Sequence, residues 1–143
     1  MRVHRIGTIV ALLVLTLTTW GCAHVASYSE EEMYSLAAAL TKLSAAVESA
    51  VAFKDPPEKL SQRELLEFAT QHDPSLLQPL DRFTLHVLRQ GGHAGVLVCT
   101  PEGARALLED AGCTARLERH WWKEDLQKPC AFTLDLSVAC PVR

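Results

Sequence analysis

The first strongly patterned stretch of the chain covers residues 29–53. Its apolar side chains recur at alternating spacings of three and four, which is the period of one helical face. Ser29 and Glu32 have the spacing of a capping box, and Pro56 and Pro57 follow the stretch, so a helix is predicted between these signals. The apolar stripe consists of Met33, Leu36, Leu40, Leu43, Val47 and Ala50.

This stripe has two interpretations. It can pack against the rest of its own domain, as the apolar face of most surface helices does. It also fits the seam of a short coiled coil, in which case Leu36, Leu40 and Leu43 would contact a helix of a partner protein. Both interpretations stay open at the level of sequence.

A second helix is predicted to begin at Ser61. Ser61 and Glu64 again have the capping-box spacing, and Leu60 and Leu65 are spaced as a hydrophobic staple. Pro74 lies beyond the end of this helix, because proline cannot continue the helical hydrogen-bond pattern.

Residues 82–100 are patterned as a β-hairpin around Gly91-Gly92, which suits a two-residue turn. Pairing Gln90 with His93 gives a register in which one face is consistently apolar, and this consistency supports the register. The apolar face carries Phe83, Leu85, Val87, Val96 and Val98, and the opposite face carries Thr84, His86, Leu88, Leu97 and Cys99.

Three further elements are predicted after the hairpin. Thr100-Pro101 has the signature of a helix start and Gly112 that of a helix end, which predicts a third helix between them. A shorter helix is expected over residues 114–126, and the alternation of residues 131–139 predicts a half-buried strand. The predicted fold class is α+β, with helices on one face of a small mixed or antiparallel sheet.

The N-terminus has the three-part pattern of a cleavable secretion signal over residues 1–21. Arg2 and Arg5 make a positive start, residues 6–17 are mostly apolar, and the last four residues are mostly small or polar. The apolar run is shorter than the roughly 20 residues that a membrane-spanning helix needs. A cleaved signal is therefore favoured over an uncleaved membrane anchor.

Gly21-Cys22 is similar to the cleavage box of bacterial lipoproteins, in which a small residue precedes a cysteine. The resemblance covers residues 1–22, and it implies that the Cys22 thiol receives a diacylglycerol with acyl chains such as palmitate. Because Ala23 rather than aspartate follows, it also implies outer-membrane retention in a Gram-negative cell, facing the periplasm. Residues 22–28 would then be a lipid-anchored tether, and residues 29–143 a single α+β domain.

The sequence contains five cysteines, an odd number for an oxidising compartment. If Cys22 carries lipid, an even set of Cys99, Cys113, Cys130 and Cys140 remains for disulfides. The predicted third helix would hold Cys99 and Cys113 about 16 Å apart, too far for a bond between them. Cys113–Cys130 with Cys99–Cys140 is the preferred pairing, Cys99–Cys130 is the alternative, and a free thiol at Cys99 is a third outcome.

Composition and charge narrow the function. With 48% hydrophobic and 22% charged residues, the chain belongs to the globular class. Removal of Arg2 and Arg5 with the signal leaves 12 basic and 17 acidic side chains, a net charge of −5. A mildly acidic chain without a basic cluster is not expected to bind nucleic acid.

Candidate chemistry is sparse. His86, His93 and His120 are metal-ligand types, but their spacing matches no common metal motif, and no nucleophile or cofactor motif is present. Trp121 and Trp122 would point about 100° apart on a helix, so they either present one exposed indole for binding or cover the edge of the core together. We therefore expect a non-enzymatic envelope lipoprotein that binds or helps to assemble an envelope protein. The alternative is a small periplasmic hydrolase, or a metal or ligand carrier, that uses one of the three histidines.

Overall fold

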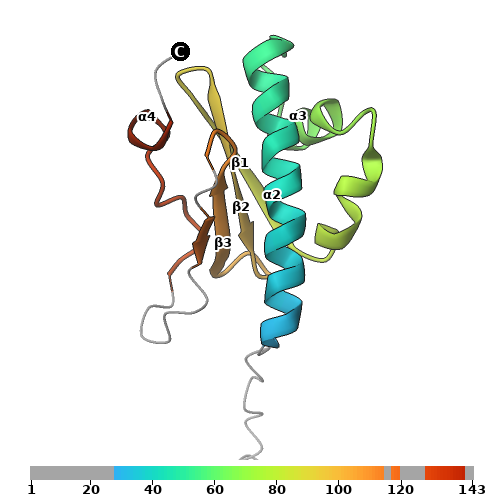
Figure 1. Ribbon diagram of the computed structural model, residues 1–143, viewed down its shortest axis with the longest axis vertical. Helices are drawn as coiled ribbons and strands as arrows, with labels where there is room; N and C mark the ends of the chain where they lie inside the picture. Colours follow the sequence, from blue (N-terminus) through green and yellow to red (C-terminus); the bar gives the residue numbers. More distant parts are fainter. Residues whose placement is uncertain (1–27, 115–116, 120–127, 141–143) are drawn as a thin grey trace, which may run out of the picture.

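The computed structural model describes residues 28–114, 117–119 and 128–140 of the chain. Its strands follow one another in the order β1-β2-β3-β4, and all neighbouring pairs are antiparallel, which confirms the predicted α+β class. Figure 1 shows α2 and α3 on one side of the sheet and α4 on the other. The elements are α2 (Glu30–Phe53), α3 (Gln62–Ala69), the 3-10 helices η1 (Pro74–Leu76) and η2 (Gln78–Leu80), β1 (Thr84–Gln90), β2 (His93–Cys99), β3 (Ala106–Ala111), β4 (Leu117–Arg119) and α4 (Leu136–Ala139).

Helix α2 is the principal helix that covers the sheet. The predicted capping box is present: the Ser29 hydroxyl accepts a hydrogen bond from the Glu32 amide at 3.2 Å, and the Glu32 carboxylate accepts one from the Ser29 amide at 2.8 Å. The predicted stripe faces the sheet, and Leu40, Leu43 and Val47 are fully buried in the main core. Tertiary packing of this stripe, more than helix propensity, therefore stabilises α2.

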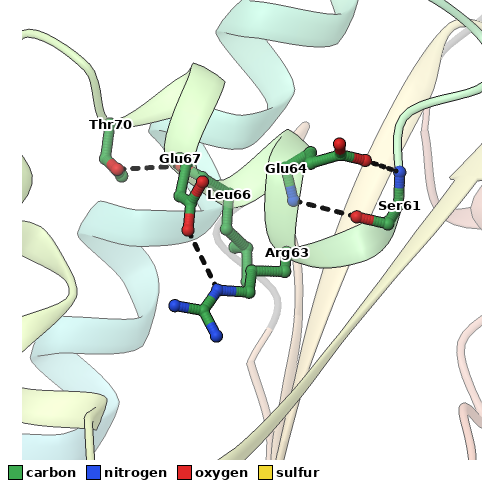
Figure 2. A network of polar contacts seen from close by, with 6 residues as sticks. All are labelled: Ser61, Arg63, Glu64, Leu66, Glu67 and Thr70. Atoms are coloured by element: carbon green, nitrogen blue, oxygen red, sulfur yellow. Dashed lines mark hydrogen bonds and ion pairs between the residues drawn. The ribbon is translucent and has the colours of Figure 1, made fainter.

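Helix α3 begins with the second predicted capping box (Figure 2). The Ser61 hydroxyl accepts from the Glu64 amide at 3.2 Å, and the Glu64 carboxylate accepts from the Ser61 amide at 2.7 Å. An Arg63–Glu67 ion pair at 3.0 Å lies on the exposed side of the helix, where such pairs contribute little to stability. The capping box, rather than the ion pair, therefore fixes where α3 starts.

The hairpin of β1 and β2 has the predicted register, with Gln90 paired to His93. Gly91 and Gly92 have φ angles of 60° and 80°. A tight two-residue turn requires such positive angles, and residues other than glycine rarely adopt them. The apolar face that this register creates packs under α2. We call the end of the sheet at this turn the turn end. The opposite end, where Phe83 contacts Tyr28, is the Tyr28 end.

The predicted third helix is wrong, because this part of the chain forms a turn and strand β3. The Thr100 amide donates to the Arg105 carbonyl at 2.9 Å, and Gly103 in the turn has a φ of 71°. Strand β3 then pairs with the free edge of β2. An unpaired edge on a fully buried strand would leave polar backbone groups without partners, so pairing outweighs the local helix signals.

Gly112 is not a helix end but a point of close approach. A β-carbon there would lie 2.3 Å from the Ser44 carbonyl oxygen of α2, so only glycine lets the chain pass this helix.

The predicted C-terminal strand is also wrong. Residues 131–135 have no regular secondary structure, and α4 follows them. The Asp135 carboxylate caps α4 by accepting from the Ser137 amide at 2.9 Å. Within the expected helix of residues 114–126, Leu117–Arg119 form strand β4, and residues 120–127 lie outside the described part of the chain.

Candidate functional site

The outer face of the sheet, opposite α2, carries the C-terminal segment of residues 128–140. Two disulfides hold it there: Cys99–Cys130 at the Tyr28 end and Cys113–Cys140 at the turn end, with Cα–Cα distances of 5.7 and 5.6 Å. The preferred pairing was therefore wrong and the alternative is the one formed. Because β3 is a strand, Cys99 and Cys113 lie at opposite ends of the sheet, and the segment meets one at each end.

A buried carboxylate attaches the middle of the same segment. Glu109 of β3 is 0% exposed. It accepts hydrogen bonds from the Thr133 amide at 2.8 Å, the Thr133 hydroxyl at 2.8 Å and the Leu134 amide at 2.7 Å. These donors satisfy a charge that would otherwise be costly to bury. They also explain why residues 131–139 do not form the predicted strand. The Thr133 and Leu134 amides, which a strand would use for pairing, donate to Glu109 instead.

Each disulfide has a histidine beside it. One imidazole nitrogen of His86 and the sulfurs of Cys99 and Cys130 lie within 4.8 Å of one another. The same holds for His93 with Cys113 and Cys140. Two of the three histidines singled out in the sequence are thus brought to cysteine pairs, although neither spacing resembles a known motif.

The histidine at the turn end is buried and has a carboxylate partner. His93 Nδ1 lies 2.7 Å from Oε1 of Glu48 on α2. The other oxygen of Glu48 accepts from the Ala94 amide at 2.6 Å. Helix α2 and the start of β2 are therefore joined by polar contacts inside the protein, next to the Cys113–Cys140 bond. Glu48 stands beside Val47 of the apolar stripe and belongs to no motif, so its role could not be predicted from the sequence.

A third buried acid, Asp110, lies on the inner face of the sheet. Desolvation of Asp110 raises its pKa to about 6, and the nearby Ser44 hydroxyl opposes part of that rise. No described residue meets the Ser44 hydroxyl with hydrogen-bond geometry, so the opposition is weak. The free-energy cost of burying the Asp110 carboxylate beside α2 is therefore only slightly offset by hydrogen bonding.

The predicted contact stripe on α2 is part of the core. Leu36, Leu40 and Leu43 are all buried against the sheet and α3, which leaves them unavailable to a partner helix in the folded chain. By length and composition alone α2 is apolar enough to cross a membrane, but this burial identifies it as a core helix.

The remaining predicted site residues, Cys22, His120, Trp121 and Trp122, lie outside the described residues. The flanks of residues 120–127 are described, however. Arg119 pairs with Leu108, and the Lys128 carbonyl accepts from the Ala106 amide at 3.0 Å. Because Ala106 pairs with Cys99, and Cys99 with Thr84, both flanks belong to the Tyr28 end of the sheet.

Charged and aromatic side chains surround Tyr28 at this end. Its ring lies 5.8 Å from that of Phe83, and the Arg82 guanidinium lies 4.9 Å from the Phe83 ring centre. Partial burial and the nearby Glu102 raise the pKa of Tyr28, while Arg82 and Arg105 oppose the rise. Phe83 is buried in the core, so the surface here consists of the partly exposed Tyr28 and charged side chains, among them the exposed Arg82 and Glu32. Tyrosine and arginine are enriched at protein contact sites.

No protein-family model matches the chain, and neither a curated protein nor a solved structure is significantly similar to it.

Proposed function

We propose that this protein is an exported lipoprotein, anchored through Cys22 to the outer membrane of a Gram-negative cell, that binds or helps to assemble another envelope protein without catalysing a reaction. One observation carries the proposal. The four late cysteines form two disulfides with each other, so Cys22 is the single cysteine of the five that is left for another role. Disulfides persist in oxidising compartments, which agrees with export.

The short tether determines which end of the domain would face the membrane. Tyr28 follows Cys22 by six residues, a length of chain that reaches roughly 20 Å when extended. The Tyr28 end of the sheet would therefore stand close to the lipid surface. The described flanks of residues 120–127 are at the same end, so the segment that carries Trp121 and Trp122 starts and ends there.

The binding role is favoured over catalysis by how the buried polar groups are used. Glu109 is engaged by the C-terminal segment, and Glu48 by His93 and the Ala94 amide. These acids support the fold, and the sequence holds no nucleophile motif. The contact surface is therefore assigned to the Tyr28 end, with its partly exposed Tyr28 and its exposed Arg82.

Metabolic labelling tests the anchor. In cells fed a clickable palmitate analogue, the full chain should be labelled and sediment with membranes, whereas Cys22→Ser should be neither labelled nor processed. The double variant C99S/C130S serves as the matched control, since it loses cysteines but keeps the lipid site. Equal labelling of the chain and Cys22→Ser would overturn the anchor.

Site-specific crosslinking tests the contact surface. A photoreactive residue in place of Trp122 is compared with one in place of Val138, which is 80% exposed on α4. Capture of a discrete envelope protein from position 122 alone supports the proposal. Equal capture from both positions contradicts it, and crosslinks from position 122 to lipid alone would replace the protein partner by the bilayer.

A further inference from the structure

The turn end of the sheet holds a cluster that the binding role does not use. His93 begins β2, Cys113 follows β3 and Cys140 follows α4, so three separate elements bring their side chains together. An imidazole nitrogen and the two sulfurs lie within 4.8 Å of one another. Imidazole and thiolate are the ligand types that Zn²⁺ prefers, and three protein ligands with one open position suit a site that exchanges its metal or its fourth ligand.

Glu48 gives this cluster a feature that its counterpart lacks. In zinc sites a ligating histidine usually donates its other ring N–H to a carboxylate, which fixes the ring and raises its basicity. Glu48 lies 2.7 Å from His93 Nδ1 and accepts from the Ala94 amide at 2.6 Å, so a metal held beside this carboxylate would bind through Nε2. No carboxylate among the described residues is hydrogen-bonded to His86, the histidine beside the other disulfide. Each group thus contains one histidine and two cysteines, but among the described residues only His93 has a carboxylate at hydrogen-bond distance.

We propose that reduction of the Cys113–Cys140 disulfide converts His93, Cys113 and Cys140 into a binding site for Zn²⁺. This inference is independent of the lipid anchor and of the protein partner. It makes the domain a redox-controlled metal carrier: oxidised chains hold no metal here, and reduced chains do.

The reductant is a dithiol, such as the active site of a thioredoxin-like protein. Its thiolate attacks the sulfur of Cys113, which is more exposed than Cys140; the S–S bond breaks and Cys140 leaves as a thiolate. The second thiol of the reductant then displaces Cys113 and closes the reductant's own disulfide. The reductant loses two electrons and two protons, the two protein sulfurs gain them as thiols, and Zn²⁺ displaces both protons when it binds.

The trio stays assembled after reduction because other contacts hold the C-terminal segment. Glu109 accepts hydrogen bonds from the Thr133 and Leu134 amides, and neither reduction nor the loss of the Cys99–Cys130 bond removes these donors. Leu136, four residues before Cys140, is 0% exposed in the outer core. The entropy lost when the metal binds is therefore smaller than it would be for a free chain end.

Cobalt titration tests the proposal on the full chain in detergent, carrying Cys22→Ser so that only the late cysteines are thiols. In the C99S/C130S background, the reduced protein should bind one Co²⁺ with a thiolate-to-cobalt charge-transfer band, and Zn²⁺ should displace it. The oxidised protein should show no band. Glu48→Gln should weaken binding by about 10- to 100-fold, as loss of such a partner does in known sites. His93→Asn should weaken it at least as much, and the exposed His72→Asn should not change it.

Two results of the titration would contradict the proposal. A reduced, folded protein without the charge-transfer band overturns the site, and so does a band that His93→Asn leaves unchanged. If circular dichroism shows that C99S/C130S is unfolded, the same titration is made on the fully reduced chain that keeps all four late cysteines. There, zero bound metal, or binding insensitive to His93→Asn, rejects the proposal.

Discussion

The two faces of the sheet are covered in different ways. On the inner face, a regular helix lays an apolar stripe that includes Leu40 and Val47 onto Val96 and Val98 of β2. On the outer face, an irregular segment is fastened at three points by two disulfides and the Glu109 carboxylate. The inner face thus depends on apolar area spread over many residues, whereas the outer face combines two smaller apolar clusters with a few specific bonds.

This difference determines how each face responds to change. Apolar burial contributes roughly 25 cal/mol for each Å² removed from water, so no single inner contact dominates. The disulfides span 31 and 27 residues, and each restricts the unfolded chain by about 3–4 kcal/mol in the entropic account. We therefore expect the outer covering to detach in steps when individual bonds are lost, and the inner covering to unfold together with the whole domain.

The largest effect is expected from Leu40→Glu on the inner face. Leu40 is 0% exposed, and a charge placed there without a partner should lower the free energy of unfolding by at least about 4 kcal/mol. Denaturant unfolding followed by circular dichroism measures this loss. Ala45→Glu, on the exposed side of the same helix, is the matched control and should change stability by less than about 0.5 kcal/mol. A Leu40→Glu variant with an unchanged midpoint would show that the stripe is not core.

On the outer face, Glu109→Gln should cost about 2–3 kcal/mol. A carboxylate accepts all of the donated hydrogen bonds, whereas an amide offers one oxygen and turns two N–H donors toward other donors. Hydrogen exchange should show faster exchange at the Thr133 and Leu134 amides, with the α2 amides still protected. Thr133→Val removes the hydroxyl alone and should cost about 1 kcal/mol. Uniform exchange in all regions would mean that the two faces unfold together.

The same difference explains what could be read from the sequence. The helices, their capping boxes and the hairpin register depend on residues close in the chain, such as Ser61 with Glu64 and Gln90 with His93. Their signals are therefore visible in a single sequence. Strand β3 was missed because Thr100-Pro101 and Gly112 resemble helix ends, while the open edge of β2 that attracts this strand appears only in three dimensions.

The candidate site was the part least accessible to sequence reasoning. Glu109 and Asp110 have the composition of a solvated surface, yet both are buried, one under the C-terminal segment and one under α2. The correct cysteine set followed from counting, and Cys99–Cys113 was rightly excluded, but the choice between the two remaining pairings was wrong because it depends on which distant segments meet. The approach of His93 to Cys113 and Cys140 combines three distant segments, and nothing local in the chain signals it.

The smallest expected effect is the pH dependence of the free energy of unfolding. Its sign differs between an acid on the inner face and one on the outer segment. Burial raises the pKa of Asp110 from 3.8 to about 6, so between these values the folded chain holds a proton that the unfolded chain has released. Its contribution to stability is therefore present below about pH 4 and is lost as pH rises to about 6. Asp135, on the outer segment, has its pKa lowered by hydrogen bonds from Ser137, so its contribution is present above its unfolded pKa and is lost as pH falls.

Unfolding free energies of Asp110→Asn measured from pH 4 to 7.5 test this sign. At pH 7.5 the variant should be more stable than the parent chain by about 1–2 kcal/mol, because it no longer buries a charge. Near pH 4 it should be less stable than the parent by about 1 kcal/mol, because burial of its amide costs free energy at every pH. The full linkage for a shift of this size would be roughly 3 kcal/mol, and desolvation of the new amide offsets part of it. Asp135→Ala should show the opposite trend, losing more stability at pH 7.5 than at pH 3. A constant difference between Asp110→Asn and the parent chain across the pH range would mean that Asp110 does not titrate at the buried face of α2.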